Sequence, residues 1–175
     1  LAEESVSIRA IHRVYRELTG EDTDAFTPKD IFDIAEGMRA GNREAAIRCF
    51  DEMGEMAGAA IVNALNMVDG IVVIGGGLSG ASKYILPGML REMNRSISTF
   101  AGLNFKCLQS EVYNLMDDAE RSLFLENKSR MVKVPFADKY AVYDCSKKIG
   151  IMISSLGASK AIALGAYAYA LSRLQ

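Results

Sequence analysis

The hydrophobic and polar positions of the chain follow a helical period through most of its first part. Apolar residues three or four positions apart predict a helix over residues 7–20. A second helix is predicted over residues 28–41, because Thr27 can cap it and a proline occupies its first position. A third, long helix over residues 42–68 carries apolar residues around much of its circumference, which indicates burial on more than one side.

A different pattern begins at Gly70. The apolar, mostly β-branched residues 70–74 predict a buried parallel strand, and Gly75, Gly76 and Gly77 end it in a turn. A helix is predicted directly afterwards, over residues 81–95. Backbone N–H groups in front of a helix bind phosphate oxygens, so this turn is a candidate nucleotide-phosphate site. The alternative is structural, because glycines also let a helix pack closely on its strand.

The second half of the chain alternates shorter elements. A second strand is predicted over residues 105–110, followed by a surface helix over residues 113–128. Residues 131–136 and 140–145 predict a hairpin with an aspartate in its turn. A last helix within residues 154–171 is rich in small residues, and we expect it to pack on the sheet beside the glycine turn.

Charge and length restrict the classes of function. The 175 residues contain 20 Lys plus Arg and 22 Asp plus Glu, a dispersed net charge of −2 that does not indicate a nucleic-acid or membrane partner. The longest uncharged apolar run, residues 161–171, is half of the roughly 20 residues that span a bilayer. We therefore expect a soluble protein. Because the chain begins at Leu1 without a leader or a methionine, we also expect it to be part of a longer protein.

Candidate metal ligands and nucleophiles are few. The three cysteines are Cys49, Cys107 and Cys145. Their wide spacing and apolar or mixed surroundings predict buried, reduced thiols in the cytoplasm, with neither disulfides nor a metal cluster. His12, the one histidine, lies at the edge of an apolar helix face and is expected to be structural. Lys147 and Lys148 are expected on a solvated face.

The glycines also match a dinucleotide-binding pattern, Gly75-x-Gly77-x-x-Gly80. That pattern requires a strand near the start of a βαβ unit and an acidic residue about 20 positions later. Here three predicted helices precede the strand, and Glu111 comes late. A dinucleotide-binding oxidoreductase is therefore a weaker alternative.

Four stretches resemble the ROK family of sugar kinases and repressors, which belongs to the actin-like ATPase superfamily. They are Glu3 with Ser7, residues 35–45, residues 63–79 and the helix that begins at Leu156. The third stretch, Asn-Ala-Leu-Asn-Met-Val-Asp-Gly-Ile-Val-Val-Ile-Gly-Gly-Gly-Leu-Ser, is the most specific. Within the family, the chain is most similar to glucokinases of Bacteroides-type gut bacteria. The resemblance implies an α/β fold over residues 1–175: the C-terminal, actin-like (ribonuclease H-like) lobe, helix-dominated with a small mixed sheet.

The resemblance also implies a reaction, the Mg²⁺-dependent transfer of the ATP γ-phosphate to a hydroxyl of a hexose such as glucose. Gly75, Gly76 and Gly77 match the family's glycine motif at the nucleotide, and Glu3 matches a glutamate that binds sugar hydroxyls. A shift of one residue would give that role to Glu4. The family's phosphate-binding glycines, catalytic aspartate and zinc cluster match no part of this chain. No catalytic residue is therefore assigned, and the lobe alone is expected to be inactive.

A repressor of the same family is the other alternative. In such a protein this lobe would mediate dimerisation, while a separate helix-turn-helix segment would bind DNA. The small-residue faces of the helix over residues 42–68 and of the last helix predict either a homodimer surface or two internal packing faces.

Overall fold

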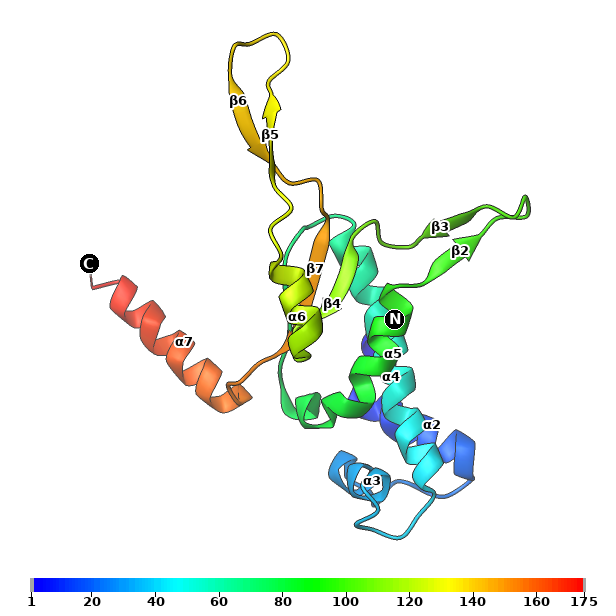
Figure 1. Cartoon of the computed structure of the whole chain (residues 1–175). Helices are drawn as coiled ribbons and strands as arrows, with labels where there is room; N and C mark the ends of the chain where they lie inside the picture. Colours follow the sequence, from blue (N-terminus) through cyan, green and yellow to red (C-terminus); the bar gives the residue numbers. More distant parts are fainter. Residues whose placement is uncertain (1, 175) are drawn as a thin grey trace.

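A computed structural model describes residues 2–174, and the two ends of the predicted lobe, Leu1 and Gln175, lie outside the described residues (Figure 1). The chain is a helix-rich α/β structure with small sheets. Its helical part consists of α1 (Ala2–Ser5), α2 (Ile8–Thr19), α3 (Pro28–Ala35), α4 (Arg43–Leu65) and α5 (Ser82–Met93). The predicted cap of α3 is confirmed. Thr27 and Asp30 form a reciprocal capping box at the start of α3. At the start of α4, the Asn42 side chain accepts a hydrogen bond from the N–H of Ala45.

Helices α4 and α5 lie side by side and form the centre of the core (Figure 1). A Cβ atom on Gly54 of α4 would lie 2.1 Å from the carbonyl oxygen of Ile85, and one on Gly88 of α5 would lie 2.3 Å from that of Asp51. Each helix therefore needs glycine where the other backbone crosses it. The small residues of α4 lie at this internal contact. For that helix the structure therefore supports the internal packing face over the homodimer surface.

A three-stranded parallel sheet covers one side of the helices. Its strands are β1 (Val72–Ile74), β7 (Lys148–Ile153) and β4 (Glu111–Asn114), in the order β1-β7-β4. The prediction of a buried strand before the glycine turn is wrong in one respect. Among the described strands, β1 pairs only with β7 and its Val73 is exposed, whereas Ile149 and Ile151 of β7 are buried. The central strand is thus β7, which was not predicted.

Two other predicted elements are displaced. The strand expected over residues 105–110 is replaced by β3 (Asn104–Lys106) and a bent connection in which Leu108 is buried. The helix expected over residues 113–128 is shorter, α6 (Asp118–Leu125), because Asp117 caps it and the residues before it pair with β7 as β4. The small mixed sheet is likewise wrong, since the described strands form one parallel sheet and two separate antiparallel ribbons.

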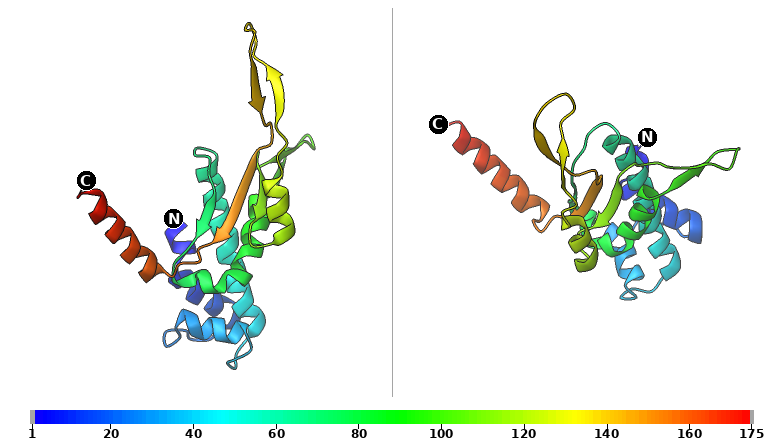
Figure 2. Two further views of the ribbon diagram at one scale, coloured as in Figure 1. Left: turned by 60° about the vertical axis from the view of Figure 1, so that its left-hand side comes forward. Right: turned by 45° about the horizontal axis from the view of Figure 1, so that its top comes forward.

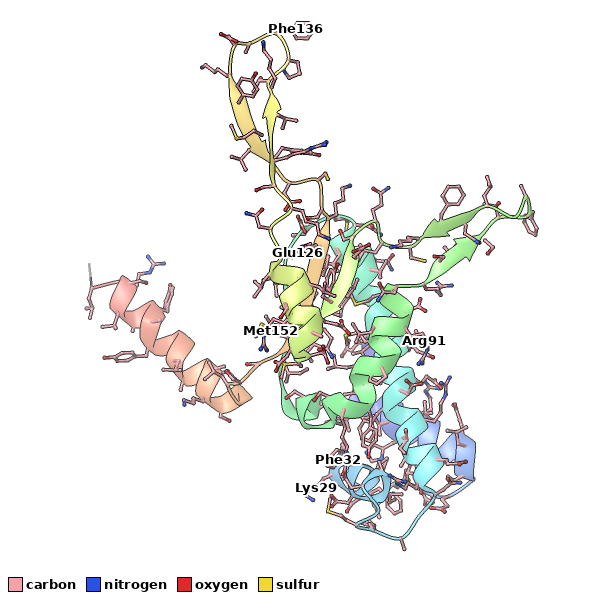
Figure 3. All side chains as sticks on the ribbon, in the orientation of Figure 1. Lys29, Phe32, Arg91, Glu126, Phe136 and Met152 are labelled. Atoms are coloured by element: carbon pink, nitrogen blue, oxygen red, sulfur yellow. The ribbon has the colours of Figure 1, made fainter. Side chains whose placement is uncertain are left out.

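The two ribbons project away from the helices and the parallel sheet (Figures 1 and 2). One pairs β2 (Ser96–Ser98) with β3, and the other pairs β5 (Arg130–Lys133) with β6 (Tyr140–Tyr143). The second ribbon confirms the predicted hairpin. Phe136 lies at its tip, fully exposed and with a left-handed φ of 60° (Figure 3).

The last helix, α7 (Ala158–Ser172), does not pack on the sheet as expected. It begins beside the glycine turn and then extends away from every other helix (Figure 2). Its side chains from Ser159 onward are all exposed. The apolar composition predicted a covered helix, but no segment among residues 2–157 lies along it. The composition therefore predicts a buried environment that residues 2–157 do not provide.

Candidate functional site

The glycine turn lies at the carboxyl end of β1, in front of two consecutive helices. Gly75 and Gly76 leave the strand, and a short 3-10 helix, η1 (Gly77–Ala81), leads directly into α5. Gly76 has a φ of 96° and a ψ of −178°, a combination that is accessible essentially only to glycine. The N–H and the hydroxyl of Ser79 both donate to the Gly76 carbonyl oxygen, at 3.2 and 2.7 Å. These two hydrogen bonds stabilise the turn.

The space around these glycines separates the two interpretations of the turn. A Cβ atom on Gly76 or Gly77 would meet no atom within 4 Å, and one on Gly75 would make an ordinary contact of 3.7 Å with Ser154. Close packing of the helix on its strand therefore does not explain the glycines. What they leave is an open surface of backbone at a helix start, where the first N–H groups have no partner within the helix. The N–H groups of such a surface can donate hydrogen bonds to an anionic oxygen.

A second loop lies beside the turn at the same edge of the sheet. The N–H of Ser154, which follows β7, donates to the carbonyl oxygen of Ile74 at 2.8 Å. The Ser154 hydroxyl is within hydrogen-bond distance of Leu156, and α7 begins after Gly157. In sheets of parallel strands, ligands bind at the carboxyl edge. Sequence reasoning missed Ser154 as a member of this edge because β7 itself was not recognised.

An apolar cavity of about 700 Å³ lies next to the turn. Its wall combines the segment between α1 and α2 with the glycine turn and with apolar residues of α4 and α5. The lining includes Val6, Ser7, Ile8, Met53, Ala57, Gly75, Gly77, Ser79, Ile85 and Met89. The Ser7 hydroxyl oxygen is buried and has no hydrogen-bond partner within residues 2–174. The fold therefore brings two of the singled-out stretches, the one around Ser7 and the glycine turn, to one cavity.

Glu3, the predicted sugar ligand, is not part of that cavity wall. It lies in α1 with 82% of its side chain exposed, and its carboxylate is 3.8 Å from the guanidinium of Arg9. Glu4 lies closer to the same guanidinium, at 3.2 Å. Arg9 thus faces both candidate glutamates, and the geometry does not favour one over the other.

The comparisons with known proteins give one decisive similarity. No protein-family model and no curated protein sequence matches the chain. A solved structure does match: the glucokinase from Parabacteroides distasonis ATCC 8503, with 51% sequence identity and a TM-score of 0.82 over 98% of this chain. The chain is similar to part of a glucokinase. It spans 46% of that protein's length, or about half. The resemblance to glucokinases is confirmed.

The sheet order argues against the dinucleotide-binding alternative. In that fold the strand after the glycine-rich helix pairs with the first strand, and its acidic residue lies at the carboxyl edge. Here β7 separates β4 from β1, and Glu111 opens β4 at the amino edge, opposite the glycine turn. The glucokinase-like chain therefore shares the glycine spacing of the dinucleotide pattern without its geometry.

The remaining chemically interesting residues have structural surroundings. A ring nitrogen of His12 lies 3.2 Å from the Thr23 carbonyl oxygen, as expected for a structural histidine. The prediction of three buried thiols is wrong for Cys145, which is exposed, whereas Cys49 is buried. All three cysteines are free thiols. No group of three or more His, Cys, Asp or Glu that could hold a metal ion is found in the described part of the chain.

Lys148 is not simply solvated, as the sequence suggested. It is half-buried, and its ammonium donates to the carbonyl oxygens of Leu123 at 2.9 Å and Glu126 at 2.8 Å, at the end of α6. A cation at a helix C-terminus satisfies carbonyls that have no partner within the helix. Lys147 points elsewhere and donates to Gln109 at 3.1 Å. None of the described helices is both long and apolar enough to cross a membrane.

Proposed function

We propose that this chain forms the C-terminal, actin-like lobe of a ROK-type hexose kinase, which transfers the γ-phosphate of ATP to a hydroxyl of glucose or a similar hexose. The similarity to the Parabacteroides glucokinase, at 51% identity over nearly the whole chain, carries the proposal. The open glycine turn adds support from chemistry, because it offers backbone donors to a phosphate and is not required by packing.

The proposed nucleotide site uses backbone rather than side chains. N–H groups of Gly76 and Gly77 would donate to phosphate oxygens, and the positive end of the η1–α5 segment would favour their charge. Mg²⁺ bound to ATP typically keeps several waters and takes only one or two carboxylates from a protein. The lack of a metal-binding cluster among residues 2–174 is therefore compatible with a magnesium nucleotide. The ion would neutralise charge on the transferred phosphoryl group.

The sugar in this proposal binds near the first helices. Glu3 would accept hydrogen bonds from sugar hydroxyls, and Arg9 would have to release it first. No aspartate of this chain is assigned as the base that takes the hydroxyl proton. The isolated chain is accordingly proposed to bind nucleotide without phosphorylating sugar, and the full protein to work in the cytoplasm as a homodimer.

Calorimetric titration with Mg-ADP tests the nucleotide site. In the variant Gly77→Asp the new side chain has room and the φ is not left-handed, so the fold should survive while a carboxylate occupies the phosphate position. Gly70→Asp is the matched control, because Gly70 also has open space but lies before β1, away from the carboxyl edge. We expect the parent chain and Gly70→Asp to bind Mg-ADP, and Gly77→Asp to lose binding at least tenfold.

The contrary results are equally specific. Equal binding by all three chains would show that ADP binds elsewhere, and binding of NAD in place of ADP would restore the oxidoreductase alternative. A parent chain that binds neither nucleotide would remove the glycine turn as support. The kinase proposal would then rest on the glucokinase similarity alone.

A further inference from the structure

A second cavity lies at the edge of the parallel sheet opposite the glycine turn. Its volume is about 840 Å³, which is within the usual range for small-molecule sites. Ser110 and Lys148 line it, and they lie at the amino ends of β4 and β7. Glu126, at the end of α6 nearer the ribbon of β5 and β6, also belongs to its wall (Figure 3). The cavity is therefore separate from the proposed phosphate site.

Contacts among its own residues form the wall of this cavity. The wall combines the end of α4, the connection before β4, the end of α6 and the connection from β6 to β7. The Asn66 amide donates to the carbonyl oxygen of Cys107 at 3.3 Å, which joins the first two parts. The Lys148 ammonium, bound to the last carbonyl oxygens of α6, joins that helix to the start of β7. Defined interactions thus hold four distant parts of the sequence around one space.

The wall offers both hydrogen-bond donors and acceptors. Gln109 and Asn127 each use their amide oxygen as an acceptor, for the Lys147 ammonium at 3.1 Å and for a backbone N–H at 2.8 Å. Their NH₂ groups make no hydrogen bond within residues 2–174, and neither do the side chains of Asp69 and Ser110. Such a mixture suits a ligand whose polar groups both donate and accept, as hydroxyl groups do.

The charges of the wall disfavour an ionic ligand. Three carboxylates and two ammonium groups line the cavity, from Asp69, Glu126, Asp144, Lys147 and Lys148. A strongly charged ligand of either sign would therefore lie close to like charges. A neutral ligand avoids this repulsion and can still bind the polar groups.

The apolar part of the wall completes the description of the ligand. Leu108 is buried, and Phe124 is half-buried with its ring centroid 6.1 Å from that of Tyr113. A sugar ring carries hydroxyl groups at its rim and C–H groups on its faces, so it matches a wall with both kinds of surface. We propose that this cavity is a second carbohydrate site, which binds a neutral mono- or disaccharide.

This site goes beyond the proposed function and does not depend on it. It lies at the amino edge of the sheet, whereas the glycine turn lies at the carboxyl edge. A sugar bound here is therefore not the one that the proposed reaction phosphorylates. Its binding requires neither nucleotide nor catalysis.

Amide NMR spectra of the chain, recorded during titration with D-glucose, maltose or N-acetylglucosamine, test the site. We expect saturable shifts with at least one of these sugars, at residues 108–110, 124–127 and 144–148. The dissociation constant should be on the order of 1 mM, as for a small ligand with few contacts. Glucose 6-phosphate should bind more weakly than glucose, because its phosphate would lie near the carboxylates of the wall.

Two variants separate this site from the proposed catalytic sugar site. The double variant Asp69→Ala, Ser110→Ala should weaken sugar binding by about tenfold or more, because two hydrogen bonds to the ligand are lost. Neither side chain bonds to the rest of the described chain, so the fold should persist. Glu3→Ala removes the proposed catalytic sugar ligand and is the control, which should leave this binding unchanged.

Several results would overturn the proposal. An absence of saturable shifts with all three sugars at tens of millimolar would remove the site. Shifts confined to α1, and lost in Glu3→Ala, would assign the sugar to the proposed catalytic site instead. Tighter binding of glucose 6-phosphate than of glucose would make the cavity an anion site. If the double variant does not fold, the positions of the shifts in the parent chain decide between these outcomes. A failure to bind Mg-ADP would count only against the proposed function.

Discussion

Glycine has two different roles in this chain, and the space around each residue separates them. Gly54 and Gly88 are required because another backbone occupies the position of a side chain. Gly76 is required by its left-handed φ, and Gly77 is required by nothing within the described residues. The sequence alone does not separate the two roles, because glycine serves both the close packing of helices and open turns. The support for the nucleotide hypothesis is therefore the open space around Gly76 and Gly77, not the presence of the glycines alone.

Substitution of Gly54 by alanine should destabilise the chain strongly. The new methyl group would lie 2.1 Å from the Ile85 carbonyl oxygen, so α4 and α5 would have to move apart. We expect the free energy of unfolding to fall by about 3 kcal/mol, at the upper end for overpacked cores. Gly77→Ala is the control and should change it by less than about 0.5 kcal/mol, as for an exposed site. Urea denaturation measures both, and equal stability of the two variants would contradict the helix crossing.

The thiols should differ in reactivity. Burial, together with the nearby Glu52 carboxylate, raises the pKa of Cys49 to about 12, while Cys145 is exposed. Because the thiolate is the reactive form, a thiol reagent at mildly alkaline pH should label Cys145 in the native chain and Cys49 only after unfolding. Mass spectrometry after timed labelling identifies the sites, with Cys145→Ser as the control. Rapid native labelling of Cys49 would show that the core around α4 opens.

One ion pair should make stability depend on pH. The hydrogen bond from Lys83 lowers the pKa of Glu36 from its ordinary value of 4.5, so the folded state favours the carboxylate. This stabilisation is fully present above pH 4.5 and is lost as the pH falls through the lower pKa of the folded state. Glu36→Gln should therefore reduce the loss of thermal stability between about pH 5 and pH 3. The loop variant Glu21→Gln is the control, and an identical pH profile for both would contradict the coupling.

At the scale of elements, the helices with caps were predictable and the sheet was not. Thr27, Asn42 and the helical period are local signals, and they predicted where α2, α3 and α4 begin. The predicted end of α3 at Gly41 is wrong, because that helix ends at Ala35. Strand β7 carries no local signal of comparable strength, because Gly150 interrupts its apolar run, Lys147 precedes it and Lys148 is its first residue. Its partner strands are far away in the sequence, with Val72 paired to Ile151. Non-local pairing of this kind decides strands more than intrinsic preference does.

Lys148 ties two of these elements together, and its removal should loosen α6. Its ammonium satisfies carbonyl oxygens at the end of that helix, including those of Leu123 and Glu126. Lys148→Met should lower the free energy of unfolding by about 1.5–3 kcal/mol, the range for a hydrogen bond to a charged group. The neighbouring Lys147→Met, which loses only a contact to Gln109, is the matched control. Equal effects in urea denaturation, or unchanged hydrogen exchange in α6, would contradict the capping role.

At the scale of the whole molecule, the chain consists of a packed centre and three projecting elements. Helices α2 to α5 and the parallel sheet contain most of the buried residues, while the two ribbons and α7 extend into solvent (Figure 2). The apolar composition of α7 predicts that the helix is buried, and for this reason it was expected to pack on the sheet. That expectation was wrong because composition predicts that a helix is buried but does not identify the element that buries it. The glucokinase similarity, which spans about half of that protein, supplies a candidate for the cover.

A chain truncated after Gly157 should therefore be as stable as the parent. A helix that does not contact the core adds nothing to the core's free energy of unfolding, although it adds helical signal of its own. We expect the midpoint of thermal unfolding to change by less than about 2 °C, which corresponds to at most about 1 kcal/mol for a domain of this size. Gly54→Ala in the same experiment shows that a loss of core packing would be detected. A fall of more than about 5 °C on truncation would mean that α7 folds back onto the body of the isolated chain. Its exposed residues would then already be covered without the other half of a kinase.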